Sequence, residues 1–305
     1  MRPSVGPKRH DVKGREGYPG SSTRTGRHLE AGRAVDYPRT VRLTAAQLAD
    51  FDAQGFLVLP ALFSRAEVEV LRAEVPALFA EDTPANIREK VSGEVRTAMG
   101  LHLRSDVYAR LCRHPRFVEP ARQILGTDQL YIQQAKINAK VAFSGEAWQW
   151  HYDFATHHAE DGVPEPLALN LHVFLDDVTE HNGPLVFIRG SHLGGPVRTA
   201  LDTETTSYAL WTVDNETVAR LARAGGLQTA TGVAGTALIF GDCLVHGSPP
   251  NMSPWDRSIF SVILNPIANA QTLFARPDYK HHRDFSPVAP LDDDCLLTAR
   301  AGAAS

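Results

Sequence analysis

The spacing of apolar residues changes along this chain from a helical period to a strand period. Thr44 precedes a short patterned stretch that Gly55 closes, which predicts a capped helix through Asp52. The apolar run from Phe56 to Leu59 then predicts a strand. After it, Ser64-x-x-Glu67 has the spacing of a capping box, and it opens an amphipathic helix whose apolar positions are Val68, Leu71, Val75 and Leu78.

The later part of the chain favours strands. A further helix is predicted over residues 107–125, where Gly126 supplies the stop. From Leu130 to Leu264 strand signals dominate, with one polar segment of helical character around residues 213–224. Helices followed by a long series of strands predict an α+β fold. The strands would form a double-stranded β-helix, the jelly-roll or cupin-like barrel, with flanking helices.

Composition divides the chain into an arm and a body. Residues 1–40 hold Gly, Arg, Ser and Pro with scarcely any apolar periodicity, which predicts a flexible N-terminal arm. The remaining residues, 41–305, are long enough to bury a full core, and we expect them to form one domain.

Charge and cysteine content narrow the classes of partner. The net charge is −4, and no Lys/Arg-rich stripe interleaves with aromatic residues, which excludes nucleic acid as an expected partner. No apolar stretch approaches the roughly 18–20 residues of a membrane span. Cys112, Cys243 and Cys295 form no Cys-x-x-Cys pair, which favours a reducing cytoplasm. A small-molecule substrate is therefore the expected partner, together with a homodimer.

His151, Asp153 and His246 form the most informative group of candidate ligands. A lone His-x-Asp is often a buried histidine hydrogen-bonded to a carboxylate, so the pair means little by itself. Residues 148–154 are rich in aromatics, however, and predict a strand whose alternation would place His151 and Asp153 on one face. Two imidazoles and one carboxylate on one face of iron(II) leave positions open for a co-substrate and dioxygen.

Arg257 follows His246 by eleven residues and supplies a second piece of this chemistry. An apolar run ends at Asp242, His246 follows, and a Pro-rich loop leads to a second strand from Arg257 to Leu264, so we expect His246 and Arg257 side by side. The alternative is an exposed charge at a strand edge. Because the strand is mostly apolar, the guanidinium would need a partner, and the distal carboxylate of 2-oxoglutarate suits its planar donor fork.

Several blocks of residues carry a resemblance to a known family. They are Gln134-Ala135-Lys136-Ile137-Asn138-Ala139-Lys140, Trp150-His151-Tyr152-Asp153-Phe154, Asn182-Gly183-Pro184-Leu185, Gly190-Ser191-His192 and His246-Gly247-Ser248 with Asn251, Ser253 and Arg257. In this order they resemble the phytanoyl-CoA dioxygenase superfamily, and within it the ectoine hydroxylase branch. The similarity runs from about Val41 to Pro290, and such an ordered series is far more specific than the three ligands alone.

The resemblance implies a role for individual residues. Members use non-haem iron(II), 2-oxoglutarate and O₂ to hydroxylate an unactivated C–H bond, and they release succinate and CO₂. His151, Asp153 and His246 would be the iron ligands, and Arg257 with Ser248 would hold the distal carboxylate of 2-oxoglutarate. Gln134 and Asn138 match pocket positions, with Gln134 in the place that contacts 2-oxoglutarate.

Departures from the ectoine pattern bear on the substrate. That branch typically has Ser, Glu and Trp where this chain has Tyr152, Ala155 and His157, and it has an Arg where this chain has Ser144. The loss of a ring that stacks on the substrate would weaken ectoine binding by about 1 kcal/mol or more. The loss of a side chain that donates to the substrate carboxylate would weaken it by a similar amount. Ser144, Tyr152 and His157 are therefore the expected substrate-binding positions of a site that takes another small amino acid or amino-acid-derived metabolite.

Other functions stay open at this point. Ectoine 5-hydroxylase proper is the first alternative. Asp153 disfavours a halogenase, because halogenases of this superfamily have a small residue in place of that carboxylate. A zinc hydrolase could use the same His, Asp and His set, but it has no evident use for Arg257. A non-catalytic metal-binding barrel is the last alternative, and the retained Gln134 and Arg257 argue against it.

Overall fold

Local capping signals fix the first elements of the fold. The computed structural model describes residues 42–205, 207 and 209–298, so the predicted arm at residues 1–40 lies outside the described residues. Helix α1 (Ala45–Gln54) begins after Thr44, whose side chain accepts from the backbone of Gln47, and it ends at Gly55 with a φ of 86°. Strand β1 (Phe56–Leu59) follows, and Ser64 with Glu67 forms the predicted capping box of α2 (Arg65–Ala80).

The predicted helix over residues 107–125 is wrong as a single element. The structure has α4 (Asp106–Cys112) and α5 (Pro115–Leu125) there, and the short α3 (Leu101–Arg104) precedes them. Pro115 has no backbone N–H to continue a helix, but it suits the first turn of a new one, and the His114 side chain accepts from the Arg116 N–H as the cap. The predicted stop at Gly126 and the polar helix, α7 (Asn215–Gly225), are both confirmed.

Two antiparallel sheets face each other in the described part of the chain, as expected for a jelly roll. The first sheet has the order β1, β11 (Ala237–Gly241), β6 (Leu169–Phe174), β13 (Arg257–Pro266), β4 (Leu130–Lys140), β3 (Val95–Met99) and β2 (Asn86–Arg88). The second has the order β10 (Leu227–Ala230), β7 (Leu185–Ile188), β12 (His246–Ser248), β5 (Trp148–His151), β9 (Leu210–Val213) and β8 (Thr199–Asp202).

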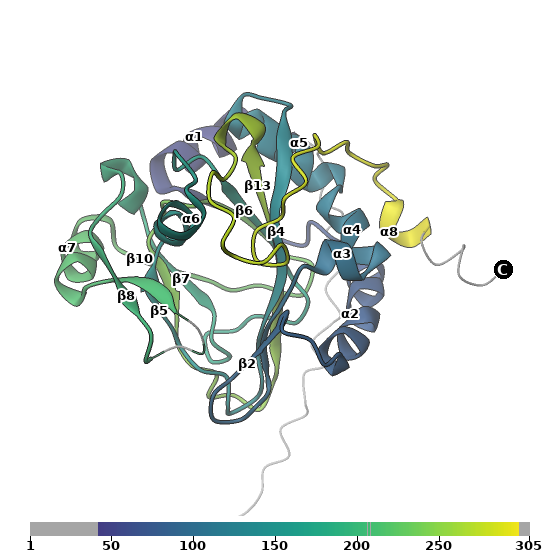
Figure 1. Cartoon of the computed structure of the whole chain (residues 1–305), viewed down its shortest axis with the longest axis horizontal. Coiled ribbons are helices and arrows are strands. Elements are labelled where there is room, and N and C mark those ends of the chain that lie inside the picture. The colour runs from purple at the N-terminus through teal and green to yellow at the C-terminus, as the bar shows by residue number, and fades with distance from the viewer. Residues whose placement is uncertain (1–41, 206, 208, 299–305) are drawn as a thin grey trace, which may run out of the picture. The chain divides into compact units, whose positions relative to one another are not determined.

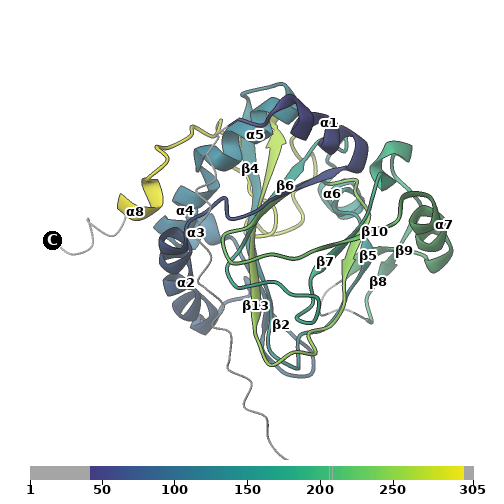
Figure 2. The ribbon, with the colours of Figure 1, turned by 180° about the vertical axis from the view of Figure 1, so that it is seen from behind.

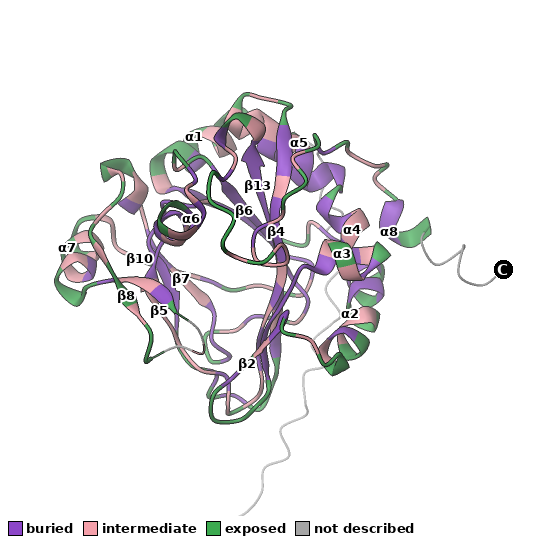
Figure 3. Cartoon of the chain, in the orientation of Figure 1, coloured by how far each residue is buried: buried purple, intermediate pink, exposed green. Residues whose placement is uncertain are grey.

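Strand alternation separates two apolar cores. In β11, Ala237 and Ile239 belong to the core between the first sheet and the helices, whereas Leu238 and Phe240 belong to the core between the sheets. Helices α2, α3, α4 and α5 lie along the outer face of the first sheet (Figures 1 and 2). Its central strands are buried, while the outward side of α2 is exposed (Figure 3). The inner face of this sheet carries the second, smaller apolar core.

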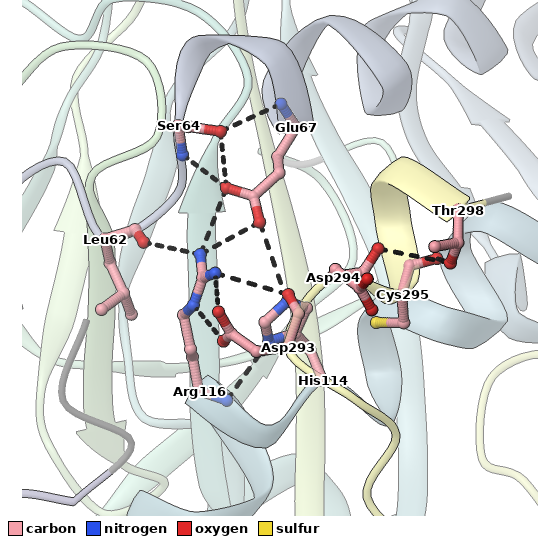
Figure 4. A network of polar contacts seen from close by, with 9 residues as sticks. All are labelled: Leu62, Ser64, Glu67, His114, Arg116, Asp293, Asp294, Cys295 and Thr298. Carbon is pink, nitrogen blue, oxygen red and sulfur yellow. Dashed lines mark hydrogen bonds and ion pairs between the residues drawn. The ribbon is translucent and has the colours of Figure 1, made fainter. Parts of the chain in front are cut away.

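A buried ion-pair network ties α2 and α5 to the C-terminal segment (Figure 4). The Arg116 guanidinium is fully buried, and its Nε donates to Asp293 Oδ1 at 2.6 Å. Its Nη1 lies 3.1 Å from Glu67 Oε1 and donates to the Leu62 carbonyl at 2.9 Å. Since every nitrogen has an oxygen partner, the desolvation of this charge is offset. Three short elements complete the described part of the chain: the 3₁₀ helices η1 (Ser191–Gly194) and η2 (Ile267–Asn269), and the helix α8 (Cys295–Thr298).

None of the helices in the described ranges has the length and apolar character needed to cross a membrane. Cys112, Cys243 and Cys295 are all buried and free of disulfide bonds.

The Arg116 network generates a prediction about stability. Arg116→Ala leaves the carboxylates of Glu67 and Asp293 without their buried partner, so we expect the free energy of unfolding to fall by about 3–5 kcal/mol. Chemical denaturation checks this value. The matched control is Arg65→Ala, which removes an exposed pair with Glu69 and is expected to change stability by less than about 1 kcal/mol. Equal effects of the two substitutions would contradict the role given to the network.

Candidate active site

A cavity between the two sheets is lined by polar side chains from both. In β4, Ala135 and Ile137 point to the helix-covered core, and the alternate residues point to the cavity. The same alternation operates in β6 and β13, so that one face of each strand is apolar and the other lines the site. The cavity-lining residues from these strands are Gln134, Lys136, Asn138, Asn170, His172, Arg257 and Ile259.

The predicted ligand triad meets at this cavity. His151 and His246 are cross-strand partners in β5 and β12, and their ring centroids are 4.3 Å apart. One ligand atom from each of His151, Asp153 and His246 can be chosen so that all lie within 4.8 Å of one another. Both histidines are buried, and the carboxylate of Asp153 is 15% exposed. The three side chains are therefore close enough to share one metal ion.

Hydrogen bonds fix the tautomers of the two histidines. Nδ1 of His151 lies 2.6 Å from the Gln149 carbonyl, and Nδ1 of His246 lies 2.9 Å from the Leu244 carbonyl. A carbonyl oxygen only accepts, so each Nδ1 must carry a proton, and in the neutral ring each Nε2 then has a free lone pair. This is the arrangement that orients a histidine for metal ligation.

Asp153 reaches the triad by a different route from the one predicted. The strand ends at His151, Tyr152 is the N-cap, and Asp153 is the first residue of α6 (Asp153–Asp161). The alternation argument for Asp153 is therefore wrong. A carboxylate in the first turn suits the positive end of the helix dipole. Asn170 Nδ2 donates to Asp153 Oδ2 at 2.9 Å, which leaves Oδ1 on the side of His151.

The electrostatics of the triad favour metal binding. Burial, and next the neighbouring His246 ring, lower the pKa of His151 to about 3. Burial alone would raise the pKa of Asp153, but His246 and Lys136 outweigh it and hold that pKa well below its usual range. At neutral pH the site thus presents a neutral His151 imidazole and an ionised carboxylate, the forms that bind a metal without first losing a proton. The donor set suits iron(II).

Arg257 lies at the start of β13 with its guanidinium buried in the cavity wall. Its Nε and Nη2 donate to the Gly183 carbonyl, Nη2 also donates to Ser248 Oγ at 3.2 Å, and Nη1 donates to the Asn138 carbonyl. Burial and the neighbouring Arg96 lower its pKa to about 9. No ion pair between Arg257 and a carboxylate is found in the described ranges, so an incoming anion would supply the missing negative charge.

The expected side-by-side placement of Arg257 and His246 needs correction. β12 and β13 do not pair; they lie in the two facing sheets, and the loop between them crosses from one sheet to the other. Both residues still line the same cavity, with Ser248 between them in sequence. A hydrogen bond between Arg257 in one sheet and Ser248 in the other joins the two walls of the cavity at this point.

Two predicted pocket residues of β4 also line the cavity. Gln134 Nε2 donates to the Lys280 carbonyl at 2.5 Å, while its Oε1 is buried with no hydrogen-bond partner among the described residues. Asn138 Oδ1 accepts from Thr97 Oγ1 at 3.0 Å. An unsatisfied buried amide oxygen facing a cavity suits a ligand that donates a hydrogen bond.

Of the three predicted substrate positions, one lines the cavity in the described residues and two do not. His157, on α6, lines the cavity, and its Nδ1 lies 4.0 Å from Asp242 Oδ2. Tyr152 is absent from the described lining; its ring packs in a separate apolar cluster, and its hydroxyl donates to the Val197 carbonyl at 2.6 Å. Ser144 is likewise absent from that lining and lies in the turn after β4, where its N–H donates to the Val141 carbonyl.

Several residues of the cavity wall were not predicted from the sequence. Lys136, Asn170 and His172 could have been found, because they share the alternation of Gln134 and Asn138 or of β6. Arg276 lies in an irregular segment after η2, where no periodicity places it. The other lining residues that were missed are Met99, Trp148, Thr156, Leu185, Leu210, Phe240 and Ile259.

Fold and site together define a jelly-roll protein with a mononuclear metal site of the two-histidine, one-carboxylate type. The model of the family "Phytanoyl-CoA dioxygenase (PhyH)" matches residues 51–259, and the chain belongs to that family. It is a non-haem iron(II)- and 2-oxoglutarate-dependent dioxygenase. The resemblance and the fold class predicted from the sequence are both confirmed, and the zinc hydrolase and the non-catalytic barrel are not supported.

Relatives and solved structures agree with this assignment. L-Proline trans-4-hydroxylase from Streptomyces griseoviridis is 38% identical over 256 residues, which cover 81% of this chain and 95% of that protein. Ectoine dioxygenase from Bordetella bronchiseptica is 36% identical over 268 residues, with coverage of 82% and 86%. The crystal structure of EctD from S. alaskensis with 2-oxoglutarate and 5-hydroxyectoine matches with a TM-score of 0.72 at 34% identity, covering 82% of this chain and 87% of that chain.

The triad generates a prediction about metal binding. His246→Ala removes one candidate ligand from the cavity wall, so we expect iron(II) affinity to fall by about a hundredfold or more. Loss of a residue that only hydrogen-bonds to a metal ligand already lowers metal affinity by about ten- to a hundredfold. Turnover is lost with it, while circular dichroism still reports a folded protein. His158→Ala, at an exposed histidine outside the described lining, is the matched control. Near wild-type turnover of His246→Ala with iron would refute the metal assignment.

Proposed function

We propose that this dioxygenase hydroxylates a small amino acid or an amino-acid-derived metabolite. The observation that carries the proposal is the opening of the triad and of the buried Arg257 into one cavity. His151, Asp153 and His246 would hold iron(II). When bound with 2-oxoglutarate and O₂, the metal supplies the oxidising power for C–H hydroxylation, and 2-oxoglutarate becomes succinate and CO₂.

The residues of the wall would hold the co-substrate. Arg257, supported by Ser248, presents buried N–H donors to the distal carboxylate of 2-oxoglutarate, and carbonyl oxygens already fix the plane of its guanidinium. Gln134 and Asn138 lie on the same wall and would complete the pocket, Gln134 through the second hydrogen of its Nε2 amide, because 2-oxoglutarate has no donor for Oε1. Lys140 is a weaker candidate anchor, because its Nζ donates to the carbonyls of Ser248 and Pro249. Lys136 is the better alternative, since it lines the cavity.

Charge in the cavity supports a substrate that carries a carboxylate. Arg276 lines the wall beside α6, and His157 lies on that helix. With Arg257 assigned to the co-substrate, the Arg276 guanidinium is the fork available to a second carboxylate. The names of the relatives match this class, since one acts on L-proline and others on ectoine.

Ectoine 5-hydroxylation is the second candidate function. Several relatives between 34% and 36% identical carry the name ectoine dioxygenase. His157 in the cavity disfavours it, because an imidazole offers less stacking surface than the indole typical of that branch. Ser144 no longer bears on the choice, as it is absent from the described lining.

The cellular compartment and the oligomeric state are two further proposals. We retain the cytoplasm as the expected compartment, which the three free, buried cysteines support. A homodimer is retained as well, and light scattering of the purified protein would test it.

An assay of succinate formation tests the proposed function. The purified protein is supplied with iron(II) and 2-oxoglutarate under air, with a panel of free and acylated amino acids and ectoine. We expect iron-dependent succinate formation that one amino acid or amino-acid derivative stimulates, with equal amounts of hydroxylated product. If no member of the panel stimulates succinate formation, the proposed substrate class is wrong.

The assignment of Arg257 generates a prediction about the co-substrate. Lysine supplies a point charge in place of the planar fork, so we expect Arg257→Lys to raise the KM for 2-oxoglutarate by about tenfold or more. Iron affinity stays unchanged, because Arg257 is not a metal ligand. An unchanged KM would show that another residue anchors the co-substrate, and Lys136→Met would then be measured in the same assay.

His157 generates a prediction about specificity. His157→Trp restores a large ring to the cavity wall, and we expect ectoine-dependent succinate formation to increase by roughly fivefold in kcat/KM, which corresponds to about 1 kcal/mol of stacking. The parent protein is measured beside it. If the parent already used ectoine faster than any amino acid in the panel, our interpretation of His157 would fail, and the protein would be an ectoine hydroxylase.

A further inference from the structure

Arg276 presents only one edge of its guanidinium to the protein. Its Nε donates to Asp161 Oδ1 at 2.7 Å, and its Nη2 donates to Asp161 Oδ2 at 2.5 Å. The side chain is 16% exposed and lines the cavity. Nη1 makes no hydrogen bond with another described residue, so its two N–H groups remain for a ligand.

Asp161 is itself held from several directions. Its carboxylate is 1% exposed, and Oδ2 also lies 2.8 Å from Nδ1 of the buried His281. On the far side of that ring, Nε2 lies 3.2 Å from the Tyr131 hydroxyl. Burial raises the pKa of Asp161, but His281 and Arg276 outweigh it, and the net pKa lies below the usual value. The carboxylate is therefore a fixed anion behind Arg276.

Backbone contacts join the segment of Arg276 to the same point. The Asp161 carbonyl accepts from the N–H groups of Thr272 and Leu273 at 3.0 and 2.9 Å. The next residue, Gly162, has a φ of 66°, and a Cβ there would lie 2.3 Å from the Thr272 hydroxyl oxygen. Only glycine permits this close approach without strain. The irregular segment is thus fastened to the C-terminal end of α6.

Helix α6 consequently connects two functions. Its first residue is the metal ligand Asp153, and its last residue is Asp161, about 12 Å away along the helix axis at the rise of an α-helix. A helix is rigid over such a length, so the distance from the metal ligand to the guanidinium of Arg276 is set by one element. A substrate held by Arg276 would then present the same carbon to the metal at each turnover.

We propose that Asp161 is a positioning residue that aims the free edge of Arg276 at a carboxylate of the substrate. This inference rests on the proposed function, because it takes the amino-acid substrate class as given. Asp161 acts through Arg276 and contacts neither iron nor 2-oxoglutarate. The consequence is that substrate affinity and coupling depend on Asp161, while the affinities for metal and co-substrate do not.

The test compares carboxylate recognition in variants. Asp161→Asn keeps the shape of the side chain but places an amide donor against the donors of Arg276. Using the amino acid that best stimulates the parent enzyme, we expect its KM to rise by about tenfold or more, as for loss of a charge-assisted contact. More 2-oxoglutarate is then consumed without hydroxylated product. The KM for 2-oxoglutarate and the iron affinity stay within about twofold of the parent values.

A substrate analogue separates positioning from a general structural role. The parent enzyme should prefer the amino acid over its carboxamide, which lacks the negative charge, and Asp161→Asn should lose most of that preference. Arg276→Gln should lose it as well, and the double variant should be no worse than Arg276→Gln alone, because Asp161 acts through Arg276. Glu160→Gln is the matched control, since Glu160 lies 3.8 Å from Arg276 Nε and is 32% exposed.

Full additivity in the double variant, or an unchanged carboxylate preference in Asp161→Asn, would overturn the inference. If Asp161→Asn does not fold, Asp161→Glu replaces it; that variant keeps the charge and displaces the guanidinium by one methylene, and parent-like kinetics in it would also overturn the inference. The parent enzyme's own succinate formation is measured first, so a failure of the proposed function is seen before any variant is compared.

Discussion

Positive charge buried in the cavity is the constraint on which the site depends. Arg257 and Lys136 line the cavity, and no ion pair joins either of them to a carboxylate in the described part of the chain. Burial lowers the pKa of each, because desolvation disfavours the charged form. Uncompensated charge in such a position is expensive by several kcal/mol, so a site of this kind is completed by its ligands. Asp153 already lies near Lys136, and a dicarboxylate co-substrate would place further negative charge against Arg257.

The jelly roll makes this arrangement compatible with a stable fold. Each strand of the first sheet gives alternate residues to the helix-covered core, where Ala135, Ile137 and Val262 are fully buried. The other residues face the second sheet and carry the chemistry. Apolar burial on one face thus supports the desolvation of polar groups on the other, and α6 brings Asp153 and His157 to the cavity from the connection between the sheets.

Local signals in the sequence predicted local structure well. The caps of α1 and α2 and the strand that contains Arg257 form as expected, because each depends on residues a few positions apart. The break at Pro115 was also visible in the sequence and was missed. The triad was found because residue type and spacing identify it, although the reason given for Asp153 was wrong: a helix and not a strand presents it.

The sequence pattern could not predict the contacts between segments that lie far apart in the chain. Arg276 comes to the cavity through Asp161 and Thr272, across an irregular segment with no periodicity. Tyr152 lies between two candidate metal ligands in sequence, yet its side chain packs in a separate apolar cluster at the start of a helix. The facing of β12 and β13 across two sheets is likewise a property of topology, which spacing along the chain does not specify.

The central claim is that one cavity holds the metal and the co-substrate side by side through residues of both sheets. A crystal structure of the protein with iron(II) and 2-oxoglutarate, prepared without oxygen, tests it most directly. We predict iron bonded to Nε2 of His151, to the carboxylate of Asp153 and to Nε2 of His246, with the distal carboxylate of 2-oxoglutarate on Arg257 and Ser248. Iron bound elsewhere, or a distal carboxylate held by Lys136 with Arg257 still bonded only to carbonyls and Ser248, would contradict the account.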